Sequence, residues 1–372
     1  MSTVLVAHPS PDLYGSDRML LESVDGLREA GHRVVVTLPR PGPLLAELTA
    51  RGVHTAVIDV PVLRKSLLSP LGLLRFAAGT VRALPAVFGL LRRERPVAVY
   101  VNTVTIPLWL AAARLTGRPV LGHVHEAEEG VPRVVRAALA LPLLLASTVV
   151  VNSRASGAAL DVLPGLRRKV RLLYNGVPGP AADLPAPTGG SRLVLVGRLS
   201  PRKGTDVAVD AVALLRAEGR DVTLDLAGSV FPGYEWYEEQ LRAQVAAHGL
   251  GDAVRFLGFI PSVWQAHARG DVVLVPSRVE PFGNTAVEGQ LAGRPVVVSG
   301  TQGLVEIVEH GRTGLVVPPD DPAALAGALR TLLDDPAYAA RLAATGRDEA
   351  RRRFDPARYR AEMAAAVDSL AR

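Results

Sequence analysis

Short apolar runs alternate with longer amphipathic stretches along most of the chain. Thr3–His8 is a continuous apolar run, a helical pattern follows to about Ala30, and 33–36 is apolar again. Runs buried on both faces are typical of parallel strands, which need a crossover of helical size between them. Since such crossovers are right-handed, the pattern predicts an α/β fold with a doubly wound parallel sheet.

The same alternation begins a second time after residue 190. Residues 178–190 are rich in Pro, Gly and Ala, as linkers are, and 192–197 is again an apolar run. A chain of 372 residues also exceeds one ordinary core. The predicted division is a first domain 1–177, a linker 178–190, a second domain 191–352 and a terminal helix 353–372.

Val275–Glu288 is the stretch with the clearest chemistry, because it leaves a buried strand, crosses a loop with Pro and Gly, and enters a helix. Asn284 or Thr285 is expected to cap that helix, which ends near Ala292–Gly293. A helix N-terminus after such a loop is a phosphate site, because its N–H groups and dipole favour an anion.

Two carboxylates flank this phosphate site. Glu280 lies in the loop, where it can face whatever the phosphate carries, and Glu288 lies about one turn into the helix. A carboxylate there can accept two hydrogen bonds from a vicinal diol such as a ribose. The alternative is that both are ordinary surface acids.

A basic loop follows the first strand of the second domain. Arg198 and Lys203 lie between Gly197 and a helix that begins at Thr205, and Lys203 is one of only three lysines in the chain. An arginine can bind two oxygens and a lysine adds a compact charge, a pair suited to a diphosphate. A solvated basic turn is the alternative.

Two places in the first domain are candidates for ligand contact. Gly15, at the start of the first helix, would let the backbone approach a ligand closely. His123 and His125 share one face of a strand end, by strand alternation. Asn102 and Thr103 follow an earlier strand, and this pair is expected to cap the helix that begins at about Ile106.

Composition excludes several classes of protein. Cysteine is absent, so there is no disulfide framework and no thiolate metal site. Glu126, Glu128 and Glu129 have no second ligand cluster, so no metal is expected. The N-terminus lacks a signal-peptide pattern, which favours the cytoplasm. The most apolar run, Ala137–Val151, is shorter than the ~20 residues that span a bilayer, and a buried helix followed by a strand is expected there.

The net charge of +6 lies in the first half, where residues 1–190 hold 21 basic and 13 acidic residues. No aromatic-basic pattern accompanies it, so nucleic-acid binding is not expected. Residues 61–96 contain two apolar helical stretches with several arginines, and Glu94 is the only acid near them. Such a composition is typical of a helix on an anionic membrane, which would suit a lipid-linked acceptor. A core helix with a basic edge is the alternative.

Four motifs in order carry a family resemblance. Glu280–Glu288 resembles the acidic signature of the retaining, nucleotide-sugar-dependent glycosyltransferases of family 4, which have the GT-B fold. Gly197–Gly204 is similar to their diphosphate-binding segment, Tyr174–Val177 to their interdomain entry, and Glu306–Leu315 to a late loop of the second domain. Together the motifs span most of the chain.

The resemblance implies two Rossmann-like domains that face a cleft, with a C-terminal helix returning to the first. It implies transfer of a sugar from a nucleotide diphosphate sugar to a hydroxyl acceptor with retention of configuration and without metal or cofactor. The leaving phosphate would take the acceptor's proton. The implied catalytic residues are His125, Glu280, Arg198 and Lys203. The implied donor-binding residues are Gly15, Arg198, Lys203, Phe259, Ile260, Glu280, Phe282, Gly283, Asn284, Thr285 and Glu288.

The chain departs from the family pattern at two positions. Ser16 follows Gly15 where the family often has a second glycine, and Gln302 replaces the first of two glycines before Glu306. The alternatives are an epimerase or hydrolase of the same fold and a binding or scaffold protein without catalysis. A dinucleotide oxidoreductase would need a Gly-x-Gly-x-x-Gly after the first strand, which is absent. The nucleotide (UDP, GDP or another), the sugar and the acceptor stay open. The acceptor is either lipid-linked, as in cell-envelope synthesis at the inner face of the plasma membrane, or a soluble natural product.

Overall fold

The structure is a computed structural model that describes residues 1–63, 69–127, 130–187, 191–231 and 233–371. The chain divides into two compact units. Unit 1 contains Met1–Gly176 together with Pro356–Arg372, and unit 2 contains Val177–Asp355. Each is described by itself below.

Unit 1 is built on a parallel sheet with the order β3-β2-β1-β4-β5-β6-β7, seven strands within the described residues. Its strands are β1 Thr3–Ala7, β2 Arg33–Leu38, β3 His54–Val57, β4 Ala98–Val101, β5 Val120–Val124, β6 Thr148–Val151 and β7 Val170–Leu172. Its helices are α1 Gly15–Glu29, α2 Pro43–Ala50, α3 Pro70–Glu94, α4 Pro107–Leu115, α5 Arg133–Ala140, α6 Arg154–Ala159 and α14 Pro356–Ala371, with 3₁₀ turns η2 Leu141–Leu145 and η3 Pro164–Leu166.

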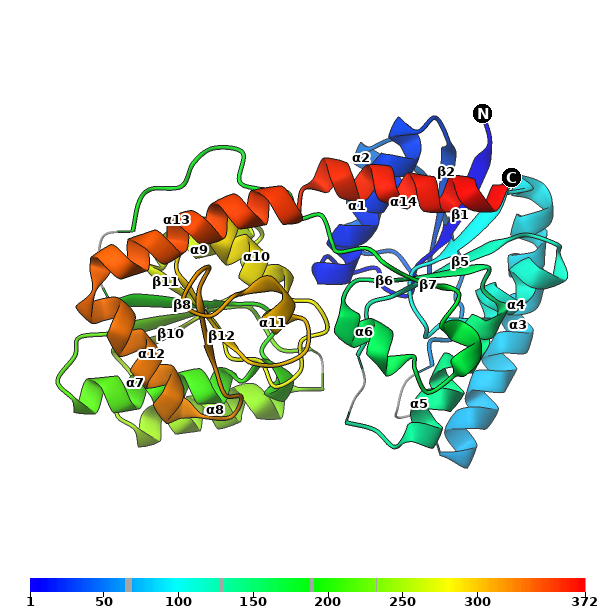
Figure 1. The fold of residues 1–372 in the computed structure, drawn as a ribbon. Helices are drawn as coiled ribbons and strands as arrows, with labels where there is room; N and C mark the ends of the chain where they lie inside the picture. Colours follow the sequence, from blue (N-terminus) through cyan, green and yellow to red (C-terminus); the bar gives the residue numbers. More distant parts are fainter. Residues whose placement is uncertain (64–68, 128–129, 188–190, 232, 372) are drawn as a thin grey trace. The chain divides into compact units, whose positions relative to one another are not determined.

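Alternate residues of β1 enter two different cores, one on each face of the sheet. Val4 and Val6 pack with α1, α2 and α14, while Leu5 packs with α3, α4 and η2. This is the doubly wound arrangement that the apolar runs predicted, and Figure 1 shows helices on both faces.

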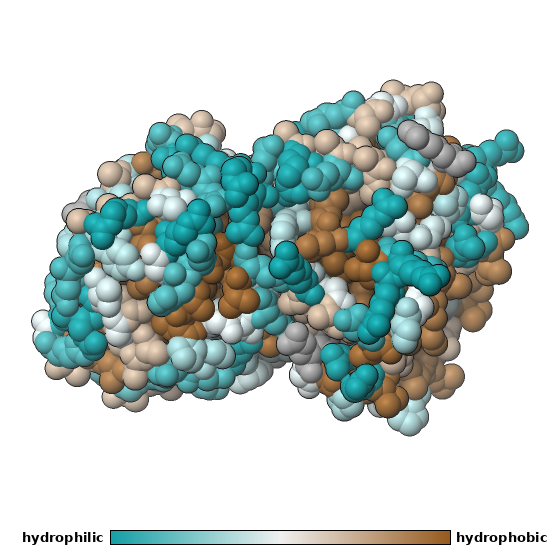
Figure 2. Space-filling view, viewed as in Figure 1, coloured by the Kyte–Doolittle hydropathy of each residue, from teal (hydrophilic) through white to brown (hydrophobic). Residues whose placement is uncertain are grey.

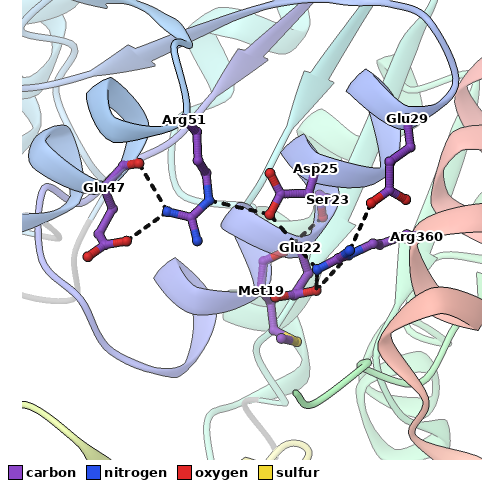
Figure 3. Close-up of polar contacts among 8 residues, drawn as sticks. All are labelled: Met19, Glu22, Ser23, Asp25, Glu29, Glu47, Arg51 and Arg360. Atoms are coloured by element: carbon purple, nitrogen blue, oxygen red, sulfur yellow. Dashed lines mark hydrogen bonds and ion pairs between the residues drawn. The ribbon is translucent and has the colours of Figure 1, made fainter. Parts of the chain in front are cut away.

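The C-terminal helix α14 packs on α1 and completes unit 1 (Figure 1). A Cβ on Gly26 of α1 would lie 2.7 Å from the Cα of Arg360, so the helices approach closely there. Arg360 donates to the carboxylates of Glu22 and Glu29 at 2.8 Å (Figure 3). Burial raises the pKa of Glu22, and the guanidinium opposes that shift.

Unit 2 contains a second parallel sheet with the order β10-β9-β8-β11-β12-β13, six strands in the part of the chain that is described. Its strands are β8 Arg192–Val196, β9 Thr223–Ala227, β10 Val254–Gly258, β11 Val272–Val275, β12 Val296–Ser299 and β13 Leu315–Val317. Its helices are the turn η4 Pro201–Lys203, then α7 Thr205–Ala217, α8 Glu235–Ala247, α9 Val263–Arg269, α10 Asn284–Leu291, α11 Leu304–Ile307, α12 Pro322–Asp334 and α13 Pro336–Arg353.

Strand order reverses once in each sheet, between β1 and β4 and between β8 and β11. Ligands of doubly wound sheets bind at the carboxyl ends of the strands beside such a point. The residues that follow these four strands are therefore the candidates for ligand contact.

Two sequence-based expectations are wrong in detail. The described part of residues 61–96 contains one continuous helix, α3, with Pro85 inside it. Proline is tolerated because the residue four positions earlier, Val81, is 64% exposed, so water can satisfy its carbonyl. The helical part of Ala137–Val151 is not buried, because α5 buries only Ala140 and the following turn η2 buries only Leu143.

α3 is the one helix in the described ranges that is long and apolar enough to cross a membrane, judged by length and composition. Only 17% of its most apolar window is buried. Arg64, Lys65, Leu67 and Leu68, which the sequence assigns to the same basic stretch, lie outside the described residues.

The chain returns from unit 2 to unit 1 between Asp355 and Pro356. Phe354 packs edge-on against Phe282, with ring centroids 5.6 Å apart. This contact keeps the end of α13 in unit 2, so only α14 joins unit 1.

Candidate functional site

The loop after β11 enters α10 through Gly283. Its φ of 117° lies where side chains are disfavoured, and it is the N-cap residue of the helix. Asn284 and Thr285 are the first helical residues and do not cap it, contrary to expectation, because the glycine turn delivers the chain directly into the helix. The helix start therefore has no side-chain cap, which leaves its dipole available to an anion.

Glu280 and Lys203 form an ion pair in unit 2. Lys203 Nζ donates to Glu280 Oε2 at 2.5 Å, and Ser277 Oγ donates to the same oxygen at 3.2 Å. Glu280 is 8% exposed. The two residues are 77 positions apart in sequence, and the fold brings them together at the reversal between β8 and β11.

Two further contacts join the basic loop to the acidic loop. A Cβ on Gly204, whose φ is 63°, would lie 2.0 Å from the carbonyl oxygen of Pro276. Arg278 donates to the carbonyl of Pro201 at 2.6 Å and, through two nitrogens, to the carboxylate of Asp206 at 2.8 and 2.6 Å. These contacts fix η4, and with it Lys203, against the strand end that carries Glu280.

Gln302 has a role that the sequence did not reveal. Its Oε1 accepts a hydrogen bond of 2.9 Å from the backbone N–H of Glu280, and its own φ is 41°. The glutamine thus adopts the backbone conformation expected of the glycine it replaces. Gly303 is the second glycine of the family pair. A Cβ on it would lie 2.4 Å from the carbonyl oxygen of Pro281, so the loop before α11 contacts the loop after β11 there.

Glu288 lies inside the first turns of α10 and is 7% exposed. Its closest ionisable neighbour is His267 of α9, whose Nε2 is 3.8 Å from Glu288 Oε2. His267 is fully buried, and neither of its ring nitrogens has a hydrogen-bond partner among the described residues. No pattern in the sequence pointed to His267.

The remaining donor-site candidates of unit 2 differ in exposure. The Arg198 guanidinium lies over the ring of Phe231, which the sequence did not select. Phe259 is 53% exposed after β10, beside the half-buried Ile260. The Phe282 side chain is 3% exposed and packs edge-on against Phe354.

In unit 1, His125 follows β5 and its ring contacts that of His123, with centroids 3.9 Å apart and the ring planes tilted by 40°. Its Nε2 is 2.7 Å from Asn102 Oδ1, and its backbone N–H donates to Glu126 Oε2 at 3.0 Å. Burial, with a smaller contribution from His8, lowers the pKa of His125 to about 3. The ring is therefore neutral at physiological pH.

Gly15 is the first residue of α1. The carboxylate of Asp17 accepts a hydrogen bond of 2.7 Å from the Tyr14 N–H and so supports the helix start. No group of three or more His, Cys, Asp or Glu that could hold a metal is present among the described residues, which do not include Glu128 and Glu129.

Comparison with known proteins identifies the chain's family. Residues 15–176 match the model described as "Glycosyl transferase 4-like domain", and residues 181–349 match "Glycosyl transferases group 1". The chain belongs to the GT-B glycosyltransferases of family 4. The resemblance read from the four motifs is thereby confirmed, and so is the fold of two Rossmann-like parallel sheets.

Curated relatives of this glycosyltransferase differ in substrate. It is 36% identical over 197 residues to a glycogen synthase of Mycobacterium tuberculosis, covering 52% of this chain and 46% of that one. It is 39% identical over 151 residues to a D-inositol 3-phosphate glycosyltransferase of Jonesia denitrificans, covering 39% and 35%. A lipopolysaccharide core mannosyltransferase of Rhizobium leguminosarum is 34% identical over 195 residues, covering 51% and 55%. The aligned part of the chain spans about half the length of these relatives or less.

Solved structures are similar over the whole chain. Anabaena Alr3699/HepE, in complex with UDP and glucose, has a TM-score of 0.84 at 25% identity and covers 99% of this chain and 100% of its own. A sucrose-phosphate synthase from Thermosynechococcus elongatus has a TM-score of 0.80 at 22% identity, covering 100% and 99%, which shows the shared fold alone.

Proposed function

We propose that this protein transfers a sugar from a nucleoside diphosphate sugar to a hydroxyl acceptor with retention of anomeric configuration. The observation that carries the proposal is the Lys203–Glu280 pair beside the uncapped start of α10. A cation, a carboxylate and a helix N-terminus at one edge of a sheet suit a diphosphate that carries a hydroxylated group.

The groups of unit 2 supply electrostatic stabilisation as the bond to the diphosphate breaks. Negative charge then develops on the leaving oxygens, where Lys203, Arg198 and the start of α10 can oppose it. Because these groups are held by the fold, they need little rearrangement during the reaction. Glu280 orients hydroxyls of the sugar, and the leaving phosphate accepts the proton of the attacking hydroxyl.

The overall test is to supply UDP-glucose and other nucleoside diphosphate sugars with candidate acceptors and to follow the product by NMR. An α-linked product from an α-linked donor supports the proposal, and an inverted product contradicts retention. Release of free sugar or an epimer at the same rate with and without acceptor would instead identify a hydrolase or epimerase.

We predict that Glu288→Ala weakens binding of the free nucleoside diphosphate at least tenfold. A carboxylate that accepts two ribose hydroxyls loses charge-assisted hydrogen bonds worth about 1.5–3 kcal/mol each, and ~1.4 kcal/mol is a factor of ten. Isothermal titration calorimetry measures this. Glu239→Ala, which removes an exposed acid from α8, is the matched control. Equal affinities of the two variants would remove Glu288 from the nucleotide site.

The surface of α3 supports a membrane-bound acceptor. In its first half Leu71, Leu74 and Val81 are exposed beside Arg75 and Arg82. Its second half is anchored in the core by the buried residues Ala83, Val87, Leu90 and Leu91. Figure 2 shows apolar surface along the lower right part of unit 1, where α3 runs. An apolar face with basic residues binds anionic lipid, so we place a lipid-linked acceptor there.

We predict that the protein binds anionic vesicles at low salt and that Arg75→Glu with Arg82→Glu reduces this at least tenfold. Each basic residue near such a surface contributes about 1 kcal/mol, and salt screens the attraction. Vesicle sedimentation at two salt concentrations measures it. Arg167→Glu with Arg168→Glu, exposed elsewhere on unit 1, is the control for net charge. Failure to bind anionic vesicles at low salt would favour a soluble acceptor.

A further inference from the structure

A chain of buried polar side chains leads from α1 to His125 within unit 1. Asp17 Oδ1 is 2.7 Å from His8 Nε2, and His8 Nδ1 is 3.0 Å from Asn102 Nδ2. Asn102 Oδ1 is 2.7 Å from His125 Nε2 and 2.8 Å from the hydroxyl of Tyr100, which donates to it. His8 and Asn102 follow β1 and β4, the two strands at the reversal of strand order.

Asn102 does not cap α4, as its sequence position suggested. The N-cap residue of α4 is Ile106, and no side chain caps the helix. Asn102 is 1% exposed, and all three of its side-chain hydrogen bonds go to His8, Tyr100 and His125. A buried amide in such a network has a fixed orientation, because its carbonyl and amino groups are not interchangeable.

The directions of these hydrogen bonds follow from the carboxylate. An ionised Asp17 only accepts, so His8 carries its proton on Nε2 and has a lone pair on Nδ1. That lone pair requires the amino group of Asn102, which turns the amide oxygen toward Tyr100 and His125. His125 must then donate from Nε2. Its Nδ1 is left as an acceptor with no hydrogen-bond partner in the part of the chain that the structure describes.

The opposite arrangement requires a second proton on His8. An imidazolium would donate from Nδ1 to a reversed amide, and His125 would then accept at Nε2. The structure has the first arrangement, because the amide of Asn102 places Nδ2 toward His8 and Oδ1 toward His125 and the donating hydroxyl of Tyr100.

We propose that Asp17, His8 and Asn102 are positioning residues that keep the proton of His125 on Nε2, so that Nδ1 accepts a hydrogen bond from a hydroxyl of the transferred sugar. The sugar in this statement rests on the proposed function. The location of the proton does not, and it can be measured without a substrate.

The ionisable groups that face His125 come from several elements. They are His8 after β1, Tyr100 on β4, His123 on β5 and Glu126 in the following loop, with Asp17 of α1 behind His8 and Tyr359 of α14 reaching Tyr100 through Ser23. Since burial holds the pKa of His125 at about 3, its Nδ1 stays an acceptor throughout the neutral range.

The first experiment is NMR of protein with ¹⁵N-labelled histidine. The chain has eight histidines, and a His125→Gln variant identifies the signal of His125 by its loss. The expected result is an Nε2-protonated ring whose shifts do not change between about pH 5 and 9, more than a unit above its pKa. A proton on Nδ1, or titration within this range, would overturn the proposal.

The second experiment is the pH profile of kcat for Asn102→Asp. The new carboxylate accepts from both histidines and raises the pKa of His125. As pH falls through that raised pKa, His125 becomes charged and Nδ1 changes from acceptor to donor. We expect kcat to fall at least tenfold between pH 8 and pH 6, a loss that the unmodified protein does not show.

Asp368→Asn is the matched control for this network. His32 Nε2 is 2.9 Å from Asp368 Oδ1, so this change also breaks a histidine–carboxylate contact in unit 1, outside the network. The pH profile of kcat for Asp368→Asn should equal that of the unmodified protein. In Asp17→Asn, by contrast, NMR should show His125 as a mixture of tautomers. If folded Asn102→Asp and Asp17→Asn proteins both behave like Asp368→Asn, the proposal is wrong.

The third experiment tests the sugar hydroxyl with donors in which each hydroxyl in turn is replaced by fluorine. Fluorine cannot donate a hydrogen bond, so one position should lower kcat/KM strongly in the unmodified protein and much less in His125→Gln. Equal sensitivity of both proteins at every position would exclude the sugar contact. An unmodified protein that transfers no sugar, yet keeps the expected tautomer, would contradict the proposed function and leave the positioning network intact.

Discussion

Replacing Lys203 with alanine is expected to lower the kcat of sugar transfer more than a hundredfold while changing KM for the donor much less. The lysine charge counts most when the diphosphate departs, and ~3 kcal/mol lost in the transition state exceeds two orders of magnitude in rate. Steady-state kinetics with varied donor measure both constants. An increase in KM at constant kcat would show that Lys203 only anchors the bound donor.

The matched control for this variant is Arg202→Ala. Arg202 lies next to Lys203 on the same turn but is exposed, so the change removes equal charge without breaking the pair with Glu280. Lys203→Arg separates charge from shape, because a guanidinium keeps the charge with a different geometry. A large loss of kcat in Arg202→Ala would show that the effect comes from the total positive charge of the loop and not from Lys203 itself.

Replacing Gly204 with alanine is expected to destabilise unit 2 by about 3 kcal/mol, combining a strained backbone with a close contact. The new Cβ would lie 2.0 Å from the carbonyl oxygen of Pro276, which belongs to the backbone and cannot turn aside. The turn that carries Lys203 must then move away from Glu280. A thermal melt followed by the donor assay measures both effects.

Gly219→Ala is the control for Gly204→Ala. Gly219 has a φ of 80° at the other end of α7, but nothing lies within 4 Å of its added Cβ. This variant incurs only the backbone strain, about 1 kcal/mol, and should keep full activity. Similar losses of stability in the two variants would mean that the structure around Pro276 accommodates the new methyl group without a loss of free energy.

The sheets could be predicted from sequence because their strands are continuous apolar runs, as at Thr3–His8. The 18-residue helix α13 lacks such a signal, since it buries mainly small residues, among them Ala343, Gly346 and Ala350. α3 was predicted as two stretches, but it is one helix that contains Pro85. Whether a proline ends a helix depends on access of water to the released carbonyl, which only the fold determines.

The chemical roles of the acidic and basic loops could be predicted because carboxylates and basic side chains after a strand indicate a site for hydroxyls and phosphates. Their pairing was not, because nothing in the sequence fixes the distance between Lys203 and Glu280. Gln302 was interpreted as a loss of glycine, since its φ of 41° cannot be read from its identity. Asn102 was assigned to a helix cap because a local rule favours that position, whereas two of its partners, His8 and His125, follow other strands.

Because α14 follows unit 2 in the sequence, unit 1 is completed only after the whole of unit 2 has been synthesised. Unit 2 can fold completely while unit 1 still lacks the helix that covers Gly26 and supplies the partner of Glu22. Until then the part of the core that Tyr359, Met363 and Val367 of α14 cover stays open to water and to chaperones. A ribosome that stops before Pro356 would therefore release a chain whose unit 2 is complete and whose unit 1 lacks α14.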